Sequence, residues 1–480
     1  MDRVFTTSQH TLCSVMRASC VATCALVVLS LAGCKSLVTM PSLQTSAPEQ
    51  WRNSVQADHD RNSAQAPDLD AWWHAFGDAQ LDTLITQALS DNLSVAQARE
   101  HLVAARALAS ISTSEFRPNI NAGTLTTPDP DATASYLQVN IDARWELGLF
   151  GRTQSTQWVA QAGVDSAAAE LQSARVTLVA EVVRDYLALR GAQQQTALLE
   201  QVADAQRKRQ ALTQRRRELG LATDADLART QADVAQANAA LSEPRARGDS
   251  SAQQLALLCG LAEPQPALLT KAPMPDLLFA VPRTLPVDLL RTRPDIHRAE
   301  SAVLSAAGEL GIAKADLYPR LSLLGGITTS TTTSGGTFGF GRAVPAIGPI
   351  IDFPLFDWGA RRARVTAKEA ELSAAVYAYR QTVLEAVAET ESALSMLDAQ
   401  QARTSNLRIA VTARERDAHS TARARSFGLA DGVDQAVTAV ALIQSRLELL
   451  DAEQARNLAY IALYKSLGGA PPPVAATATD

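Results

Sequence analysis

Histidines, cysteines and closely spaced carboxylates build most catalytic and metal sites, and this chain arranges few of them in useful patterns. The six histidines show no metal-ligand spacing; they are His10, His59, His74, His101, His297 and His419. The stretch "GGITTSTTTSGGTFGFG" is rich in glycine but lacks the Lys-Ser/Thr of a phosphate-binding loop. The carboxylates of "HRAES" and "EAVAETES" are expected on solvated helical faces. We therefore predict that the chain is not an enzyme and has no metal site and no cofactor.

One cysteine is predicted to carry a covalent lipid. Residues 18–33, "ASCVATCALVVLSLAG", form an apolar stretch that is too short to span a membrane comfortably and ends in small residues, as in a secretory signal. Its end, "LAGC", resembles the bacterial lipobox, which implies that residues 1–33 are removed and that Cys34 receives diacylglycerol and palmitoyl groups. In such signals Lys35 favours sorting to the outer membrane. A plain signal peptide is the alternative, and Met16 is an alternative start.

The remaining cysteine and the charge exclude other classes of protein. Three of the five cysteines lie in the predicted signal and Cys34 would be acylated, so Cys259 is left without a disulfide partner. Its place in "LALLCG" predicts a small buried hydrophobe. The formal net charge is −6 and no basic block stands out, so nucleic-acid binding has no electrostatic basis. No second stretch is long and apolar enough for a membrane helix, so further insertion into a membrane would require strands.

The sequence contains an internal repeat. "RWELGLFGRTQ" at 144–154 is followed about 206 positions later by "DFPLFDWGARR" at 352–362. Three further anchors keep the same order: Gly220 with Gly428 and Gly260 with Gly468 at an offset of 208, and "SEFRPNI" with "ADLYPRL" at an offset of 201. Such spacing predicts two structurally similar halves of about 200 residues, because the period is too long for a solenoid repeat.

The halves and their flanks give the expected domain organisation. It is a signal peptide at 1–33, a lipid-anchored periplasmic segment at 34–75, a first repeat at 76–260, a linker or equatorial segment at 261–290, a second repeat at 291–468 and a tail at 469–480. Each repeat is expected to contain a helix, a β-hairpin and a long helical hairpin. The first helices are predicted at 79–116 and 293–317, each ending just before a proline.

Alternation of apolar and polar residues predicts the strands. Residues 136–145, "YLQVNIDARW", place Leu, Val, Ile, Ala and Trp on one face and Gln, Asn, Asp and Arg on the other. Their partner is expected at 119–127, across a turn-rich loop. In the second half "PRLSLLGGITTS" at 319–330 is the clearer strand, whereas 338–353 is interrupted by glycine and proline.

Long helices are expected after each hairpin. The segment between Gly359 and Gly428 contains neither glycine nor proline, and such a helix would be roughly 100 Å long at ~1.5 Å per residue. A shorter return helix is predicted at 433–467. The first half is expected to repeat the scheme, with Gly163, Gly191 and Gly220 interrupting it. Helices of this length require a bundle, a coiled coil or a helical barrel around them.

The whole arrangement resembles the bacterial outer membrane factors, the TolC/OprM/NodT-type efflux channels. The resemblance is carried by "WELGLFGR" at 145–152, by the segment 285–326 with its Arg-Pro-Asp and Tyr-Pro phrases, by "PLFDWG" at 354–359 and by the two Gly-Leu-Ala turns. It covers essentially the whole mature chain. Gly148 stands where the family usually has an aspartate, and a local effect is expected there.

The resemblance implies a fold, a function and partners. The fold would be an α+β membrane protein, a homotrimeric 12-stranded β-barrel with four strands per chain, continued by a long α-helical periplasmic barrel. The function would be the outer-membrane channel of a tripartite efflux system, lipid-anchored in the outer membrane and fed by a periplasmic adaptor and an inner-membrane pump, with an RND-type pump favoured. Two alternatives stay open, a type I protein secretion duct and a lipid-anchored periplasmic coiled-coil scaffold without a pore.

The resemblance also places the functional residues at the tips of the helical hairpins. The expected adaptor contacts are Gly220, Leu221, Ala222, Gly428, Leu429 and Ala430. Close to them lie Asp431, Asp434, Arg423 and Arg425. Repeated in three chains, the two aspartates are predicted to form an anionic constriction, and pairing with the arginines would hold the resting gate shut. The alternative is that these aspartates are ordinary turn and helix-capping residues.

Overall fold

The computed structural model describes residues 38–43, 48, 51–52, 69–127, 136–277, 292–332 and 341–470. The chain divides into two compact units, and each unit draws on both halves of the sequence. Unit 1 comprises residues 1–43, 104–165 and 300–378, and unit 2 comprises residues 44–103, 166–299 and 379–480. The domain boundaries predicted from the sequence follow the repeats instead of these units, and they stay predictions.

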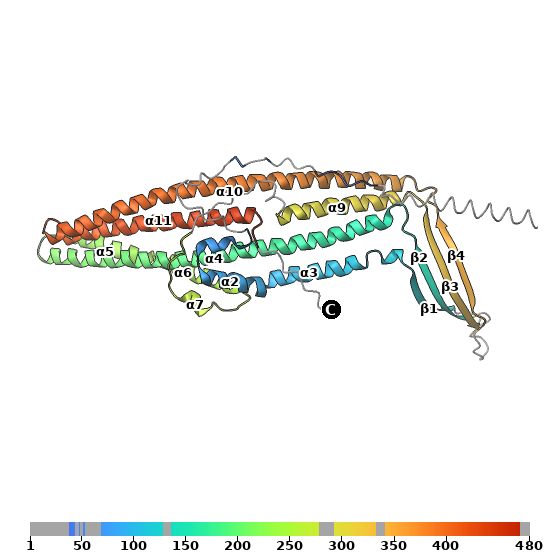
Figure 1. Cartoon of the computed structure of the whole chain (residues 1–480). Coiled ribbons are helices and arrows are strands. Elements are labelled where there is room, and N and C mark those ends of the chain that lie inside the picture. Colours follow the sequence, from blue (N-terminus) through green and yellow to red (C-terminus); the bar gives the residue numbers. More distant parts are fainter. Residues whose placement is uncertain are drawn as a thin grey trace, which may run out of the picture. The chain divides into compact units, whose positions relative to one another are not determined.

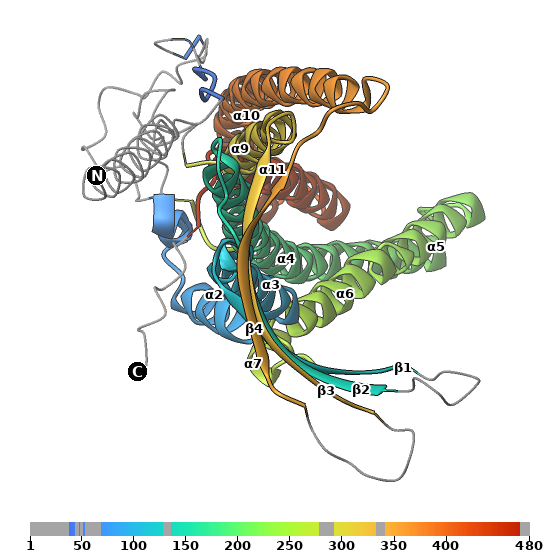
Figure 2. The same cartoon turned by 90° about the vertical axis from the view of Figure 1, so that its right-hand side faces the viewer.

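Unit 1 contains one antiparallel sheet of four strands (Figures 1 and 2). The strands are β1 (Asn119–Thr127), β2 (Tyr136–Glu146), β3 (Arg320–Thr332) and β4 (Val344–Asp352), in that order across the sheet. Each half supplies one hairpin, and β2 pairs with β3 to join the two hairpins. All four strands were predicted, including the strand that contains Pro345, Gly348 and Pro349.

The register keeps the expected alternation of faces. Asn140 and Asp142 share a face of β2, and the Asn140 Nδ2 donates to Asp142 Oδ1 at 2.7 Å. Each has a glycine opposite it on one side of β2, since Gly123 of β1 pairs with Asn140 and Gly326 of β3 pairs with Asp142. These two polar side chains therefore have room on a face that the intervening apolar residues of β2 do not share.

Two very long helices follow the hairpins. Helix α4 (Arg152–Glu218) and helix α10 (Ala360–Ser426) each contain 67 residues, which corresponds to ~100 Å. The prediction that Gly163 and Gly191 interrupt the first of them was wrong, because α4 runs through both. At Gly191 a Cβ would lie 1.5 Å from the side-chain nitrogen of Gln454. This glycine therefore permits close packing of a neighbouring helix and does not end its own.

The first helix of the chain was predicted as one element and is two. Helix α2 (Ala79–Asp91) ends at Asn92, and α3 (Leu93–Ser110) begins after it. The Asn92 Oδ1 accepts from the amides of Ser94 and Val95 at 3.0 and 3.1 Å, and its Nδ2 donates to Leu258 O. A side chain that caps the next helix in this way favours a break, which the apolar periodicity did not indicate.

The remaining elements complete two helical hairpins in unit 2 (Figure 1). Helix α11 (Gly432–Ser466) returns along α10, whereas the return along α4 is divided into α5 (Asp224–Ala239) and α6 (Ser242–Leu258). Shorter elements are η1 (Leu69–Phe76), η2 (Ser114–Phe116), α7 (Pro266–Leu269) and α9 (Pro294–Ala315). None of the helices in the described ranges is both long and apolar enough to cross a membrane.

The core of unit 2 unites both hairpins through aliphatic side chains. One cluster contains Leu198, Val202, Ala203, Ala237, Ile443 and Leu450, from α4, α5 and α11. A small aromatic cluster, which the low aromatic content did not suggest, packs η1 on the end of α11. There the Trp72 ring stacks on the Tyr464 ring at 5.4 Å, and burial raises the pKa of Tyr464 to about 12.

The two halves share a backbone offset of 208 residues at the turn from sheet to long helix. Phe150 and Gly151 adopt positive φ in the first half, and Trp358 and Gly359 adopt it in the second. The pairing of the two Leu-Phe dipeptides at an offset of 206 is therefore shifted by two residues. Gly148 is tightly enclosed in the first turn, since a Cβ there would lie 1.9 Å from the Thr153 hydroxyl. A larger residue at this position would require the side chains around it to move, which is a local effect.

Candidate functional site at the hairpin tips

The tip of each helical hairpin is a glycine turn. Gly220 ends the turn after α4 with φ of 76°, and Gly428 ends the turn after α10 with φ of 74°. The next amide, of Leu221 or Leu429, donates back to a carbonyl five residues earlier, at 2.7 and 2.9 Å. These are the bonds of a Schellman motif, which requires the left-handed conformation that glycine adopts most easily. The structure therefore places both Gly-Leu-Ala phrases at helix reversals.

The helices that leave both tips begin with the same capping box. The Asp431 carboxylate accepts from the amides of Val433 and Asp434, while the Asp434 carboxylate accepts from the Asp431 amide. In the first half Thr223 and Asp226 form the equivalent reciprocal pair. The alternative role for the aspartates, helix capping, is thus present in one chain.

The charged contacts at the tips join the two hairpins. Arg216 Nη1 lies 3.1 Å from Asp431 Oδ2, so the arginine that reaches the proposed gate aspartate comes from the first half. Arg425 donates to Gln435 instead, and among the described residues Arg423 forms no ion pair with either aspartate. Hydrogen bonds within the cap keep the pKa of the Asp431 carboxyl below its usual value. Arg216 was not predicted as a site residue, although it lies in a run of three arginines shortly before Gly220.

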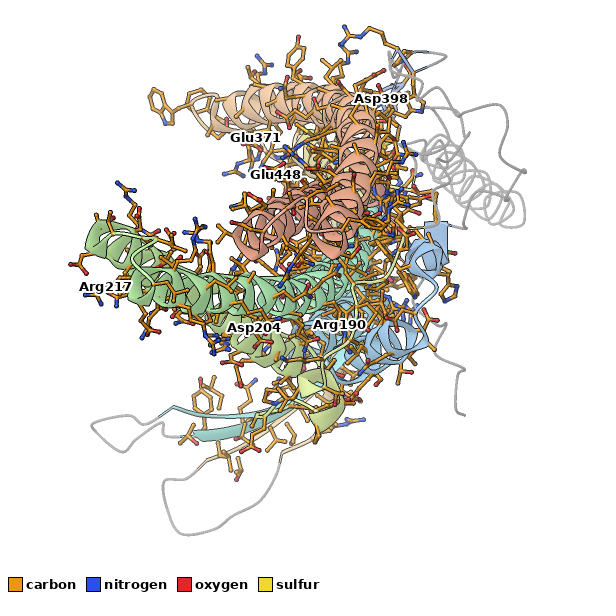
Figure 3. The ribbon with its side chains drawn as sticks, turned by 90° about the vertical axis from the view of Figure 1, so that its left-hand side faces the viewer. Arg190, Asp204, Arg217, Glu371, Asp398 and Glu448 are labelled. Carbon is orange, nitrogen blue, oxygen red and sulfur yellow. The ribbon has the colours of Figure 1, made fainter. Side chains whose placement is uncertain are left out.

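Large apolar side chains cover the tips. Leu221 is 65% exposed and Leu429 is 82% exposed, and Leu219 and Phe427 beside the turns are exposed as well. Ala222 and Ala430 are partly buried. Figure 3 shows a charged residue of the first tip, Arg217, which pairs with Asp224 at 2.5 Å. Clustered exposed apolar groups with charged neighbours are typical of a surface that binds another protein.

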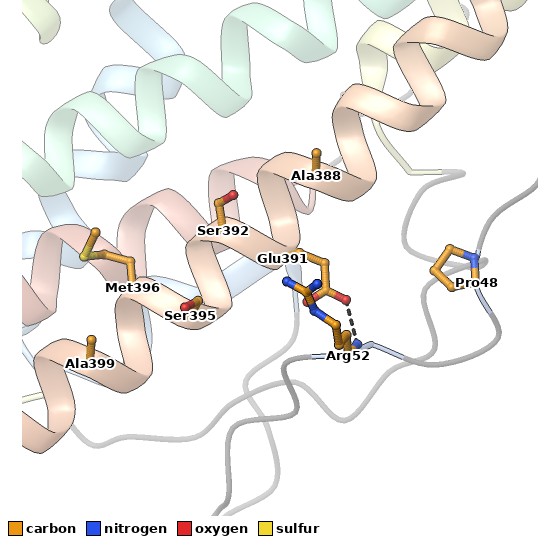
Figure 4. A pocket seen from close by; sticks show the side chains of 8 residues that line it. All are labelled: Pro48, Arg52, Ala388, Glu391, Ser392, Ser395, Met396 and Ala399. Atoms are coloured by element: carbon orange, nitrogen blue, oxygen red, sulfur yellow. Dashed lines mark hydrogen bonds between the residues drawn. The ribbon is translucent and has the colours of Figure 1, made fainter.

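Two pockets lie elsewhere in unit 2. A pocket of about 650 Å³ lies beside α10, where the amide of Arg52 donates to Glu391 at 2.6 Å (Figure 4). A pocket of about 390 Å³ lies between α4 and α6, beside an ion pair of Glu200 with Arg245. In the described part of the chain no group of three or more His, Cys, Asp or Glu side chains could hold a metal ion.

Two buried arginines hold elements together away from the tips. Arg190 (Figure 3) donates to the carbonyl of Thr270 and to Gln80, which fixes α2 and the segment after α7 to α4. Arg293, in the Arg-Pro-Asp phrase, binds Asp295 through two hydrogen bonds of 3.0 and 2.8 Å and also binds Glu389 on α10. The Arg-Pro-Asp motif therefore has a structural role, because it fixes the start of α9 to α10.

The two cysteines of interest have different outcomes. Cys259 ends α6 in a buried position, and burial raises the pKa of its thiol, in agreement with the prediction of a small buried hydrophobe. Cys34 lies outside the described residues, as does the segment 278–291, so the structure leaves the lipid attachment a prediction.

Comparison with known proteins identifies the family. The sequence pattern of the family described as "Outer membrane efflux protein" matches residues 84–261 and 285–469, one segment in each half. The chain belongs to this family. Outer membrane protein OprJ of Pseudomonas aeruginosa is 29% identical over 92% of this chain and 94% of its own length. The cation efflux system protein CusC of Escherichia coli is 26% identical over 92% of this chain and 97% of its own length.

Solved structures show the same fold. The outer-membrane channel OprN matches with a TM-score of 0.79 and 28% identity, over 92% of this chain and 100% of that chain. The open state of the MtrE outer membrane channel of Neisseria gonorrhoeae matches with a TM-score of 0.77 and 24% identity, over 90% of this chain and 98% of that chain. The expected fold class, that of the outer-membrane efflux channels, is therefore confirmed.

The family and the fold together establish what the chain does. It is the outer-membrane channel component of a tripartite efflux system, and it extends from the outer membrane into the periplasm. The interpretation as a scaffold without a pore is set aside, since members of this family are transport channels and the predicted hairpins form a sheet.

Proposed function

We propose that three copies of this chain form one channel, and that the hairpin tips dock on a periplasmic adaptor, which connects the channel to an RND-type inner-membrane pump. The observation that carries the assembly is the open sheet. In the described residues β1 and β4 each have a strand partner on one side only. Strand edges in lipid must be paired, and three four-stranded sheets would pair every edge in a twelve-stranded barrel. A native mass of three chains is expected, and a stable single chain in detergent would contradict the assembly.

The exposed leucines of the tips support the docking role. Replacing Leu221 and Leu429 by aspartate places a charge in the middle of the exposed apolar surface at both reversals, beside Leu219 and Phe427, but leaves the glycine turns and capping boxes in place. Cells that depend on this channel should lose export, while the purified variant keeps its oligomeric state and its conductance. Export at the level of the unchanged protein would contradict docking through these tips.

The tip charges support a gate at Asp431 and Asp434, with Arg216 as the partner within the chain and Arg423 and Arg425 close by. Replacing Asp431 by serine keeps a good helix N-cap and removes the charge. If pairing of Asp431 holds the gate, the resting conductance of channels in a planar bilayer should rise several-fold.

Asp224→Ser is the matched control, because it removes the carboxylate of the Arg217–Asp224 pair at the other tip. An equal rise in both variants would indicate general loosening of the tips. No rise in the Asp431→Ser channel would leave Asp431 as a capping residue only.

The lipid anchor remains part of the proposal through the "LAGC" motif that ends at Cys34. Cells that express the chain should incorporate radiolabelled palmitate into the purified protein. Label that persists in the Cys34→Ser variant would contradict acylation at this residue. No resident cofactor is proposed beyond this covalent lipid.

A further inference from the structure

Each half of the chain passes from the sheet to its long helix through the same strained turn. Phe150 and Trp358 have φ of 54° and 56°, and the glycine after each, Gly151 or Gly359, also has positive φ. A bulky L-residue adopts this conformation only at a cost in energy. The shared turn therefore identifies Trp358 as the counterpart of Phe150.

The segment that enters each hairpin is also repeated. The Arg117 amide donates to Ser114 O at 3.0 Å, and the Tyr318 amide donates to Ala315 O at 3.1 Å. Each of these residues is followed by a proline and then by β1 or β3. Arg117 is thus the counterpart of Tyr318, at the offset of 201 seen in the sequence.

In the first half, the turn is closed by the second half of the same chain. The Phe150 ring stacks on the Tyr318 ring, with centroids 4.7 Å apart and an interplanar angle of 19°. Beside it, Arg152 Nη1 lies 2.5 Å from Asp316 Oδ1. An aromatic stack and an ion pair therefore connect the start of α4 to the segment that leads into β3.

In the second half, none of the described residues takes the place of such a partner at the same turn. Trp358 is 91% exposed and Phe356 is 75% exposed. Their rings touch each other at 5.0 Å and 61°, and within the described ranges no other ring or cation packs on Trp358. An exposed pair of large aromatic side chains next to a sheet edge indicates a surface that another molecule covers.

The first half contains the residues that correspond to Tyr318 and Asp316. Arg117 and Glu115 occupy the positions of Tyr318 and Asp316, and both are exposed. In the part of the chain that the structure describes, the side chain of neither residue takes part in an ion pair or a hydrogen bond. The chain thus has two unmatched faces, and each carries what the other lacks.

We propose that Trp358 of one copy stacks on the Arg117 guanidinium of the next copy, and that Glu115 of that next copy faces the arginines which open α10, Arg361 and Arg362. This contact rests on the proposed trimer and gives it residue-level definition. The occupant of the exposed aromatic surface is therefore a second copy of this chain.

The chemistry of the two faces is complementary. Indole is the most favourable aromatic face for a cation, and a guanidinium also stacks flat upon it. Ala360 stands where Arg152 stands in the first half. The arginines that follow it carry the positive charge next to Glu115: Arg361, which also pairs with Asp357 within its own chain at 3.3 Å, and Arg362. The contact runs head to tail, from the second half of one copy to the first half of the next, as a closed ring of identical subunits requires.

Cross-linking between engineered cysteines tests the contact in the full chain. In a Cys259→Ala background, we combine Arg117→Cys with Trp358→Cys and treat native membranes with a short bismaleimide. The pair should give covalent dimers and trimers on denaturing gels, whereas neither single variant should do so. The matched control is Phe150→Cys with Tyr318→Cys, which should link within one chain and leave the monomer mass unchanged.

The outcomes separate this contact from the assembly itself. If the Arg117–Trp358 pair does not cross-link while native mass spectrometry still gives three chains, the contact is wrong and the trimer stands. If the native mass is that of one chain, both the contact and the proposed assembly fail. Covalent dimers from the Trp358→Cys single variant would show that like faces meet, and would also overturn the head-to-tail contact.

Discussion

Glycines control how closely the helices of this channel approach one another. A Cβ on Gly308 of α9 would lie 2.7 Å from the carbonyl oxygen of Ser155 and 2.7 Å from a methyl group of Val159, both on α4. Since one of these atoms is backbone, the two helices would have to move apart. Around Gly163 on α4, in contrast, there is no atom within 4 Å of the added Cβ among the described residues.

Gly308→Ala should therefore destabilise the channel by about 1–3 kcal/mol, the usual cost of overpacking. Gly163→Ala is the matched control, and it should be neutral or stabilising by up to ~1 kcal/mol, because alanine is the better helix former. Thermal dissociation of the purified protein, followed by gel mobility, measures both. Equal dissociation temperatures for the two variants would show that the α4–α9 approach does not limit stability.

At the scale of elements, Arg293 joins the start of α9 to two other helices. Its guanidinium binds Asp295 and Glu389 and also donates to the carbonyl of Ser466 at the end of α11. Burial alone raises the pKa of the Asp295 carboxyl, but the hydrogen bonds and charge of Arg293 outweigh it and lower the pKa below its usual value. Ionised Asp295 therefore favours the folded state.

The sign of the pH dependence follows from this lowered pKa. The stabilisation by Asp295 is fully present above the ordinary carboxyl pKa of ~3.9, and it is lost as the pH falls through the lower pKa of the folded state. Asp295→Asn should lower the dissociation temperature at neutral pH and flatten its fall below about pH 4. Parallel curves for the variant and the unchanged protein in acid would contradict this role of the ion pair.

The strands and the long helices were predicted from the sequence because each depends on the spacing of residues close together in the chain. The alternation in 136–145 predicted β2 because one face of a strand repeats every second residue. The break at Asn92 was missed because the apolar stripe continues across it. The partner of Asp431 was missed because Arg216 is distant in sequence, and such pairing depends on how two hairpins pack. The prediction for Gly191 failed because the sequence alone does not distinguish a glycine that ends a helix from a glycine that lets a neighbouring helix pack closely.

In the whole molecule, duplication and assembly both serve to pair the strands of the sheet. One half supplies a single hairpin, and two halves supply a four-stranded sheet whose outer edges remain open in one chain. In the first half the Phe150 ring stacks on the Tyr318 ring, whereas their counterparts, Trp358 and Arg117, are exposed. The same contact at this turn, made once within each chain and once between neighbouring chains, would then close the wall of the channel.

Electron microscopy of the purified, detergent-solubilised protein would show whether three chains enclose one channel. We expect particles with threefold symmetry and an open lumen within the sheet region, in which the β4 edge of each copy meets the β1 edge of the next. Single-chain particles, or an assembly without a lumen, would contradict it.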